Sequence, residues 1–300
     1  MYRSAPLRIR TLLALIITLT FWGSAFPVIR QALHGYPGGE LALLRFAIAS
    51  LCLAAYSLAK GLRPPRWRDL PLLFLCGLLG ISVYHVALNC GEETVAAGAA
   101  CFIINACPVF TAILARVFLG ERLRIWGWAG IALSFMGVVL IGLGEGGGVR
   151  LEPGAALILL SALSSSVYII LQKPLLQRYS AFQLTAYTIW AGTVLLLVFA
   201  PGLAGRIVSA PASATWSVIY LGVFPAALAY FTWTYLLARL PATRAASLLY
   251  IVPVITVFLA WAWLGERPTP LTASGGIVVL CGVILVNTLG RTACPAEPQP

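Results

Sequence analysis

The sequence predicts an all-α integral membrane protein with ten transmembrane helices, arranged as two inverted five-helix repeats around a central cavity. Three observations predict this class: a scarcity of charge, ten apolar stretches of membrane length, and an internal repeat. The 300 residues include only 20 basic and 9 acidic side chains, 60% are hydrophobic, and the mean hydropathy is +0.94. Soluble domains are about 45–50% apolar and about 25% charged. The composition therefore excludes a cytosolic enzyme, a secreted module and a disordered protein.

Ten long stretches with little or no charge divide the chain. A membrane-crossing helix needs about 20 mostly apolar residues, and each stretch is of that order. The predicted spans are residues 11–29, 41–59, 70–91, 94–115, 125–144, 153–172, 179–205, 207–238, 245–265 and 268–290. Arg3, Arg8 and Arg10 precede the first span, as in a signal peptide, but nine spans follow and no small-residue cleavage site is obvious. We therefore expect the first span to be a transmembrane helix.

The basic residues gather on one side of the predicted spans. With the amino terminus inside, the inner segments hold fifteen of them and the outer segments four, while Arg45 lies within a span. This asymmetry follows the positive-inside rule and places both termini in the cytoplasm. The basic residues then face anionic lipid headgroups, so the net charge of +11 requires no nucleic-acid partner. We expect a multi-pass protein of the cell inner (plasma) membrane.

The two halves of the chain repeat each other. At an offset of 143 residues, Arg30 aligns with Lys173 and Leu41 with Leu184. At an offset of 145, the matches are Pro108 with Pro253, Thr111 with Thr256, Leu119-Gly120-Glu121-Arg122 with Leu264-Gly265-Glu266-Arg267, Gly130 with Gly275, and Gly137 with Gly282. Each half holds five spans, an odd number, so the second half crosses the membrane in the opposite sense. We predict repeats at residues 1–150 and 151–300 with a substrate site between them, an arrangement typical of transporters, and a monomer suffices for it.

The sequence shows no pattern typical of catalysis, metal binding or a cofactor. All nine acidic residues are expected outside the hydrocarbon core or at span ends: Glu40, Asp69, Glu92, Glu93, Glu121, Glu145, Glu152, Glu266 and Glu297. Paired intramembrane carboxylates, a metal-ligand cluster and a nucleophile–base motif are all missing from the sequence pattern. We expect no enzyme activity, no cofactor and no metal.

Polar and aromatic residues near the middle of the spans are the candidate substrate-binding residues. They are Trp22, Ser24, Tyr84, His85, Asn105, Ser165, Tyr187, Trp190, Tyr230 and Trp233. Each has a structural alternative. Aromatic residues also anchor helices at membrane interfaces, and serine or asparagine side chains also hydrogen-bond neighbouring helices. For His85, a buried neutral imidazole and a contact with substrate or proton are equally favoured.

Two prolines at matching positions are candidate hinges. Pro108 and Pro253 each lie inside a span, where proline frees a carbonyl and bends the helix; a static bend is the alternative. The Glu-Arg pairs at 121–122 and 266–267 lie at helix ends, and we expect them to cap or bridge helices rather than bind ligand. Arg45 lies about one turn into its span, close enough to snorkel outward, so we expect a structural role for it.

These residues resemble the drug/metabolite transporter superfamily, specifically its ten-helix members built from two EamA domains. The resemblance covers residues 12–290 and rests on Trp22-Gly23-Ser24, Phe26, Leu44-Arg45-Phe46, Pro108, Gly120-Glu121-Arg122, Pro253 and Gly265-Glu266-Arg267. It implies a basket of helices around a central cavity and export of small metabolites such as amino acids. Ser164-Ser165-Ser166 replaces the second Trp-Gly-Ser element. The membrane-embedded glutamate of the superfamily's four-helix multidrug members has no counterpart on the first span, so their proton coupling is not carried over.

We therefore expect an inner-membrane exporter of small metabolites, above all amino acids, including aromatic ones. Aromatic side chains would contact the apolar part of the substrate, while Asn105 and His85 would orient its polar groups. Facilitated efflux and proton antiport both remain open. The alternative within transport is broad efflux of drugs or lipophilic cations, and the alternative of another class is a membrane scaffold or receptor without transport.

Overall fold

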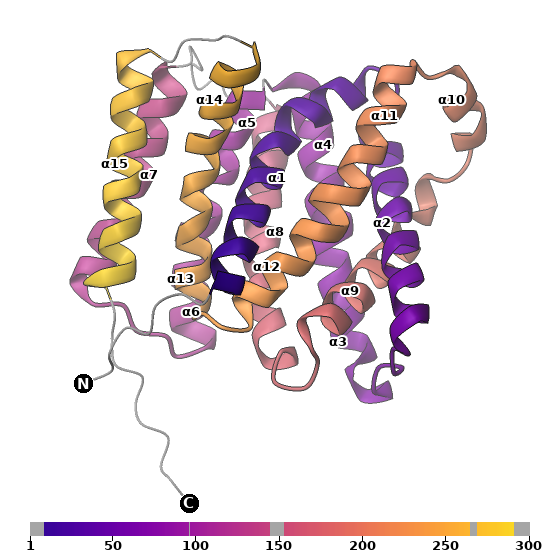
Figure 1. Ribbon diagram of the computed structural model, residues 1–300, viewed down its shortest axis with the longest axis horizontal. Helices are drawn as coiled ribbons and strands as arrows, with labels where there is room; N and C mark the ends of the chain where they lie inside the picture. Colours follow the sequence, from indigo (N-terminus) through magenta and orange to yellow (C-terminus); the bar gives the residue numbers. More distant parts are fainter. Residues whose placement is uncertain (1–8, 96, 145–152, 265–268, 291–300) are drawn as a thin grey trace, which may run out of the picture.

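The computed structural model describes residues 9–95, 97–144, 153–264 and 269–290, and all regular secondary structure within them is helical (Figure 1). The first half comprises α1 (Ile9–Leu33), α2 (Gly38–Lys60), the continuous run η1 (Trp67–Asp69), α3 (Leu70–Gly77), η2 (Leu78–Val83) and α4 (Tyr84–Thr94), the pair α5 (Ala97–Ile104) and α6 (Cys107–Phe118), and α7 (Ile125–Gly144).

The second half repeats this order. It comprises α8 (Pro153–Leu175), α9 (Ala181–Leu196) with η3 (Leu197–Phe199), the short α10 (Leu203–Ser209), the run α11 (Ala212–Leu221), η4 (Gly222–Leu228) and α12 (Ala229–Leu237), the run α13 (Ala242–Ser247), η5 (Leu248–Tyr250) and α14 (Ile251–Leu264), and α15 (Pro270–Thr288). Nine helical stretches among the described residues are long and apolar enough to cross a membrane, and Ile125–Ile141 is a shorter tenth. The predicted fold class is confirmed.

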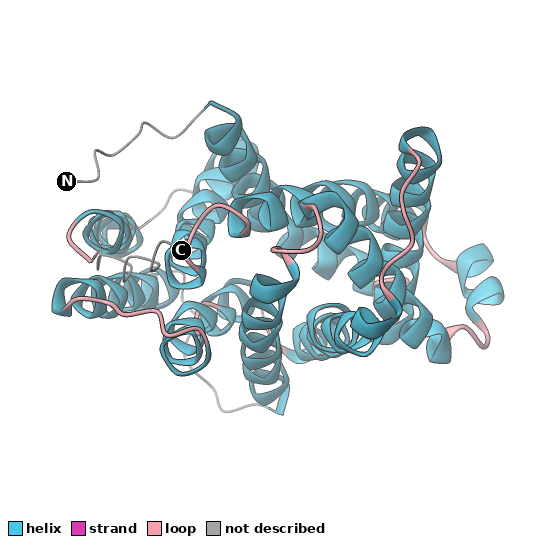
Figure 2. Ribbon diagram, turned by 90° about the horizontal axis from the view of Figure 1, so that it is seen from below, coloured by secondary structure: helices cyan, strands magenta, loops and turns pink. Residues whose placement is uncertain are grey.

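The seventh and eighth spans are shorter than predicted, because the short helix α10 lies between them. The uncharged stretch 179–205 predicted one long span, but the seventh span ends at η3 and α10 follows as a separate short helix. Pro201 lies between them, and Gly202 has a φ of +82°, a left-handed conformation that favours glycine and turns the chain. α10 lies at one end of the elongated bundle, and α7 and α15 lie at the other (Figures 1 and 2).

Equivalent contacts recur in the two halves. Arg30, at the end of α1, donates hydrogen bonds to the carbonyls of Glu92 (2.8 Å) and Val95 (3.0 Å), where α4 ends. Lys173, at the end of α8, donates to the carbonyls of Leu237 (2.9 Å) and Leu240 (2.7 Å), where α12 ends. A basic side chain thus satisfies the free carbonyls at each helix end and complements its dipole.

Equivalent helices of the two halves also contact each other directly. Ser50 on α2 hydrogen-bonds Thr193 on α9, hydroxyl to hydroxyl at 2.8 Å, and these residues are 143 positions apart. His85 on α4 bonds Tyr230 on α12, and Ser134 on α7 donates to the carbonyl of Val279 on α15 at 3.4 Å; each of these pairs is 145 positions apart. These offsets equal those of the sequence repeat, so the contacts lie along the axis that relates the halves.

Glycines bring α7 and α15 into backbone contact. A Cβ atom built on Gly137 would lie 2.6 Å from the Val279 nitrogen and 2.7 Å from the Gly275 oxygen. The equivalent atom on Gly282 would lie 2.7 Å from the Gly130 oxygen. Small residues at such positions allow the close helix approach on which packing in lipid depends.

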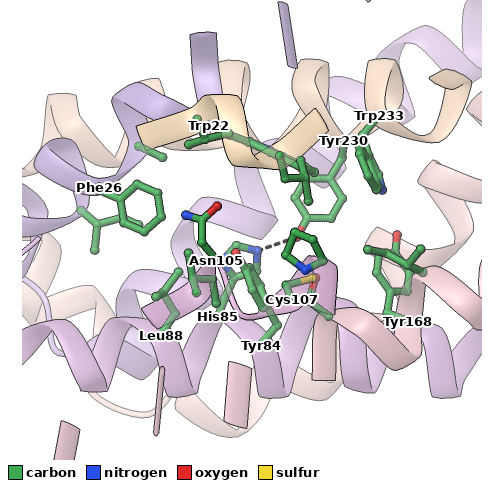
Figure 3. Close-up of a pocket in the computed structure, with 18 of the residues that line it drawn as sticks. Trp22, Phe26, Tyr84, His85, Leu88, Asn105, Cys107, Tyr168, Tyr230 and Trp233 are labelled. Carbon is green, nitrogen blue, oxygen red and sulfur yellow. Dashed lines mark hydrogen bonds between the residues drawn. The ribbon is translucent and has the colours of Figure 1, made fainter. Parts of the chain in front are cut away.

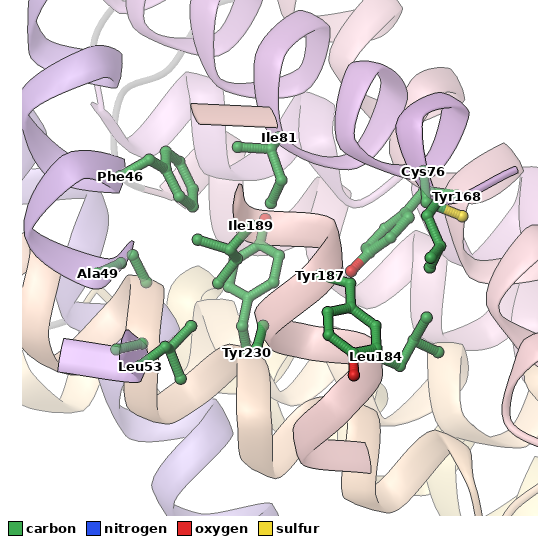
Figure 4. Close-up of a cluster of buried hydrophobic side chains, with 14 of the residues drawn as sticks. Phe46, Ala49, Leu53, Cys76, Ile81, Tyr168, Leu184, Tyr187, Ile189 and Tyr230 are labelled. Atoms are coloured by element: carbon green, nitrogen blue, oxygen red, sulfur yellow. The ribbon is translucent and has the colours of Figure 1, made fainter. Parts of the chain in front are cut away.

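A large cluster of buried apolar side chains joins α2, α3, α8, α9 and α12 (Figure 4). Phe46, Ile81 and Ile189 are fully buried there, together with the ring of Tyr230. The cluster connects elements of both halves, and it holds α2 and α12 in register around the central residues described below.

Glu121 caps a helix of the other half, as predicted. Its carboxylate accepts hydrogen bonds from the Ala242 nitrogen (2.7 Å), the Thr243 nitrogen (3.0 Å) and the Thr243 hydroxyl (2.8 Å) at the start of α13. The carboxylate satisfies two amides that have no partner within the helix and faces the positive end of the helix dipole. The corresponding Glu266 and Arg267 lie outside the described residues.

Glu121→Gln should lower the thermal stability of the purified protein. A glutamine turns an NH2 group toward backbone donors and removes the charge, at a cost of about 1–3 kcal/mol. The melting temperature in detergent measures the effect. Glu93→Gln is the control, because the exposed Glu93 accepts a single bond of 2.9 Å from the Gly38 nitrogen at the start of α2. Equal losses for the two variants would contradict this account.

Candidate functional site

A small cavity lies between the two halves at the centre of the molecule (Figure 3). Its lining comes from α1, α2, α4, α5 and α6 of the first half and from α8, α12, η5 and α14 of the second. Its volume is about 70 Å³, which is room for about two water molecules. Ligand pockets measure about 300–1,000 Å³, so the cavity is smaller in this structure than a typical ligand pocket.

Aromatic rings form one wall of this central cavity. The Trp22 ring meets Tyr230 edge to face at 5.5 Å and lies 5.3 Å from the Trp233 ring. The Trp22 indole donates to the Pro225 carbonyl at 3.2 Å, which ties α1 to the η4 segment. Tyr84 and Phe26 line the cavity as well (Figure 3). Such rings supply apolar surface together with faces that attract cations.

A buried chain of hydrogen bonds crosses the same cavity. The Arg45 guanidinium lies 3.3 Å from His85 Nδ1, and His85 Nε2 lies 2.8 Å from the Tyr230 hydroxyl. Because a guanidinium only donates, Nδ1 accepts, and the proton of the neutral imidazole is on Nε2. Tyr230 then donates to the Gly80 carbonyl at 3.1 Å. His85 therefore has a structural partner on each side and also lines the cavity.

The predicted position of Arg45 near the membrane surface was wrong. The helix begins at Gly38, so Arg45 lies about two turns inside it, and its side chain faces the centre with 2% exposure. Helix α2 places it beside α4, where its guanidinium lies near the Phe46 ring (5.5 Å) and His85. Arg45 does not snorkel to the membrane surface, and it lines the central cavity.

The helices around the cavity are irregular at equivalent places. The π-helical segments η2 and η4 come directly before α4 and α12, which carry His85 and Tyr230. Such π-bulges are frequent at functional sites. η4 contains Pro225, which cannot donate a backbone hydrogen bond.

The predicted hinge prolines also lie next to helix breaks. Pro108 follows the break between α5 and α6, and Pro253 follows the 3-10 turn η5. Proline has no amide proton for the carbonyl four residues earlier, which belongs to Ile104 and to Leu249, respectively. Ile104, Leu249 and Pro108 line the cavity, whereas Pro253 does not.

The structure brings most of the predicted site residues together. Trp22, Tyr84, His85, Asn105, Ser165, Tyr230 and Trp233 line the central cavity. The Asn105 carboxamide donates to the Cys101 carbonyl at 2.6 Å. The serines that flank Ser165 bond other helices instead: Ser164 donates to the Leu79 carbonyl and Ser166 to the Cys107 carbonyl.

Three predicted residues lie elsewhere. Ser24 faces α11, where it shares a 2.7 Å hydrogen bond with the Tyr220 hydroxyl. Tyr187 and Trp190 line a separate, mostly apolar cavity of about 680 Å³ beside α2, α3 and α9. There the Tyr187 hydroxyl donates to the Arg63 carbonyl, and the Trp190 indole donates to the Ser50 carbonyl at 3.2 Å. These three side chains connect helices and do not contact the central cavity.

Glu92 is buried more deeply than its place near a span end suggested. It lies in the last turn of α4 with 0% exposure, and neither carboxylate oxygen accepts a hydrogen bond from the described residues. It does not line the central cavity. Across the part of the chain that the structure describes, no group of three or more His, Cys, Asp or Glu side chains could hold a metal ion.

Comparisons with known proteins agree with this architecture. A family model described as the EamA-like transporter family matches residues 9–143 and again residues 152–288. The chain is 42% identical to a protein named probable terminal-alkyne amino-acid exporter from Streptantibioticus cattleyicolor, across 95% of this chain and 96% of that protein. It is 32% identical to the Escherichia coli protein named uncharacterized inner membrane transporter YedA, across 95% and 92%. A crystal structure with 22% identity shares the fold, with a TM-score of 0.75 over 94% of this chain and 97% of that one.

Proposed function

Because this chain belongs to the EamA-like transporter family, we propose that it exports amino acids across the inner membrane by alternating access. The observation that carries the proposal is the central cavity, which lies between inverted halves and combines aromatic walls with a few converging polar groups. The name of the Streptantibioticus cattleyicolor relative supports amino acids as the substrate class. The lining supports it as well, since an amino acid combines a small polar end with a side chain that is often apolar. The name of the Escherichia coli relative supports the inner membrane.

The repeat geometry supports the mechanism. Two similar halves in opposite orientation exchange conformations, and this exchange interconverts inward-open and outward-open states. A cavity of about 70 Å³ must expand to accept an amino acid, and the helix breaks before Pro108 and Pro253 give α6 and α14 places to bend. We propose that the repeats comprise residues 1–150 and 151–300 and that both termini lie in the cytoplasm, in accord with the charge asymmetry.

The lining of the cavity argues against efflux of lipophilic cations. Among the described residues that line it, none is acidic, and Arg45 contributes a positive charge. A cation entering this site would meet a like charge in a medium of low dielectric constant, where repulsion is strong. A zwitterionic solute avoids that cost.

Uptake of labelled amino acids into proteoliposomes tests the proposal. We expect saturable uptake of a few amino acids, aromatic or short and apolar. Uptake without a pH gradient indicates facilitated transport, and uptake that requires one indicates proton antiport. Absence of flux for every amino acid in the panel would refute the amino-acid assignment.

Trp22→Ala should reduce the initial rate of this uptake by up to about tenfold, since the ring forms the cavity wall beside Tyr230 and aromatic pairs contribute about 0.5–1.5 kcal/mol. Trp190→Ala is the matched control. Each indole donates one 3.2 Å hydrogen bond to a backbone carbonyl, but Trp190 lies outside the central cavity. If both variants lose the same fraction of the uptake rate, the central cavity is not the substrate site.

A further inference from the structure

We propose that Arg45 binds the carboxylate of the exported amino acid. This inference rests on the proposed function and names the chemical group that the site selects. It is drawn from a buried cation that lines the central cavity without a paired anion.

No carboxylate within the described residues forms an ion pair with Arg45, although the buried Glu92 carboxylate interacts with it electrostatically from a longer distance. The ion pairs of that part of the chain join Arg178 to Asp69 and Arg206 to Glu40. Nδ1 of His85, a neutral acceptor, takes one N–H of the guanidinium, and Nε of Arg45 is buried without a hydrogen-bond partner. A charge in the interior of a membrane protein is costly and is associated with function. A ligand carboxylate bound in the cavity would compensate the buried charge of Arg45.

The guanidinium is held ready for a planar anion. The Phe46 ring lies 5.5 Å from its central carbon, and His85 fixes one of its terminal nitrogens. His85 is itself fixed by Tyr230, which donates to the Gly80 carbonyl. An arginine fork positioned in this way offers two parallel N–H donors to a carboxylate.

The rest of the lining fits the other end of an amino acid. The side chains of Trp22, Tyr84 and Tyr230 border the same cavity, and the face of an aromatic ring attracts an ammonium group. Arg45 then repels an amine that lacks the carboxylate. The site selects a zwitterion by attraction at one end and by like-charge repulsion of the decarboxylated analogue.

The test compares L-phenylalanine with L-phenylalaninamide, in which a neutral carboxamide replaces the carboxylate. Both are titrated at a pH below about 7, under the amine pKa of about 7.7, so that both carry the ammonium group. Calorimetric titration of the full-length protein in nanodiscs measures both dissociation constants. We expect the wild type to bind the acid about 10- to 100-fold more tightly than the amide, the range of a hydrogen bond to a charged group. Arg45→Gln should abolish this preference by weakening binding of the acid and by relieving the repulsion of the amide. Arg45→Lys retains the charge without the fork and should give an intermediate preference.

Thr188→Val is the matched control. Thr188 is the residue equivalent to Arg45 at the 143-residue offset; it is fully buried and polar and does not line the central cavity. Its variant should keep the wild-type preference. If the wild type binds the acid and the Arg45 variants keep the preference, Arg45 is not the carboxylate site, while the proposed function stands. If the wild type neither binds nor transports any amino acid, the proposed function fails and the role of Arg45 fails with it.

Discussion

Gly275→Leu is expected to prevent stable folding of the protein in the membrane. The residue lies where α15 touches α7, and a Cβ atom there would be 2.8 Å from the Gly137 oxygen and 2.8 Å from the Ile141 nitrogen. Both neighbours are backbone atoms, so neither can move away by changing a rotamer. The two helices would have to separate, with the loss of van der Waals contacts on which association in lipid depends. We expect destabilisation of about 3 kcal/mol or more.

The adjacent residue on the same helix provides the control. A Cβ atom on Gly276 would meet a single side-chain atom, Val254 Cγ1, at 3.9 Å, an ordinary contact. Gly276→Leu should therefore give nearly wild-type yield and melting temperature. Size-exclusion profiles of both variants in detergent measure the difference. A monodisperse Gly275→Leu protein with a wild-type melting temperature would show that α7 and α15 are not held by this contact.

His85→Leu is expected to reduce transport about 10- to 100-fold. Leucine has a similar size but removes the acceptor for Arg45 and the donor for Tyr230. Loss of a hydrogen bond to a charged group typically costs about 1.5–3 kcal/mol. The guanidinium would then reorient, and the cavity would lose its arrangement of polar groups.

His85→Gln should recover much of that loss. Its carbonyl oxygen can accept from Arg45, and its NH2 group can donate to Tyr230. Initial rates of amino-acid uptake in proteoliposomes, at matched protein incorporation, compare the two variants. Equal uptake rates for the His85→Leu and His85→Gln variants would show that His85 acts through its shape alone. A wild-type rate for the His85→Leu variant would show that His85 has no role in transport.

The sequence allowed the spans and the repeat to be predicted because both depend on one-dimensional patterns. Membrane thickness determines the length of an apolar stretch, and the matched prolines and glycines mark equivalent positions whatever the packing. Glu121 could be assigned to a helix end because a Glu-Arg pair between two spans has few other uses. The start of α13 as its partner was not predictable, since no local pattern links residues 121 and 242.

Only part of the site was predictable, because the position of a residue along a span indicates its depth in the membrane but not the direction of its side chain. The side chains of Tyr187 and Trp190 face a different cavity from that of Tyr230. The π-helical segments η2 and η4 rotate the residues that follow them, and they have no counterpart in the hydropathy pattern. For Arg45 a signal existed: an ionisable residue inside a span marks a functional site by default. Counting from the first apolar residue placed it too near the surface.

The hydrogen bond between His85 and Tyr230 joins residues at equivalent positions of the two repeats. In an antiparallel homodimer of single repeats, a residue on the symmetry axis would face its own copy, histidine against histidine or tyrosine against tyrosine. Two copies of Arg45 would likewise bring two positive charges to the small central cavity. Fusion of the halves into one chain removes this constraint, because each copy evolves separately. The joined chain carries Arg45 at the central cavity, whereas the equivalent Thr188 is uncharged and lies outside it, so the cavity has a polarity that a symmetric dimer could not have.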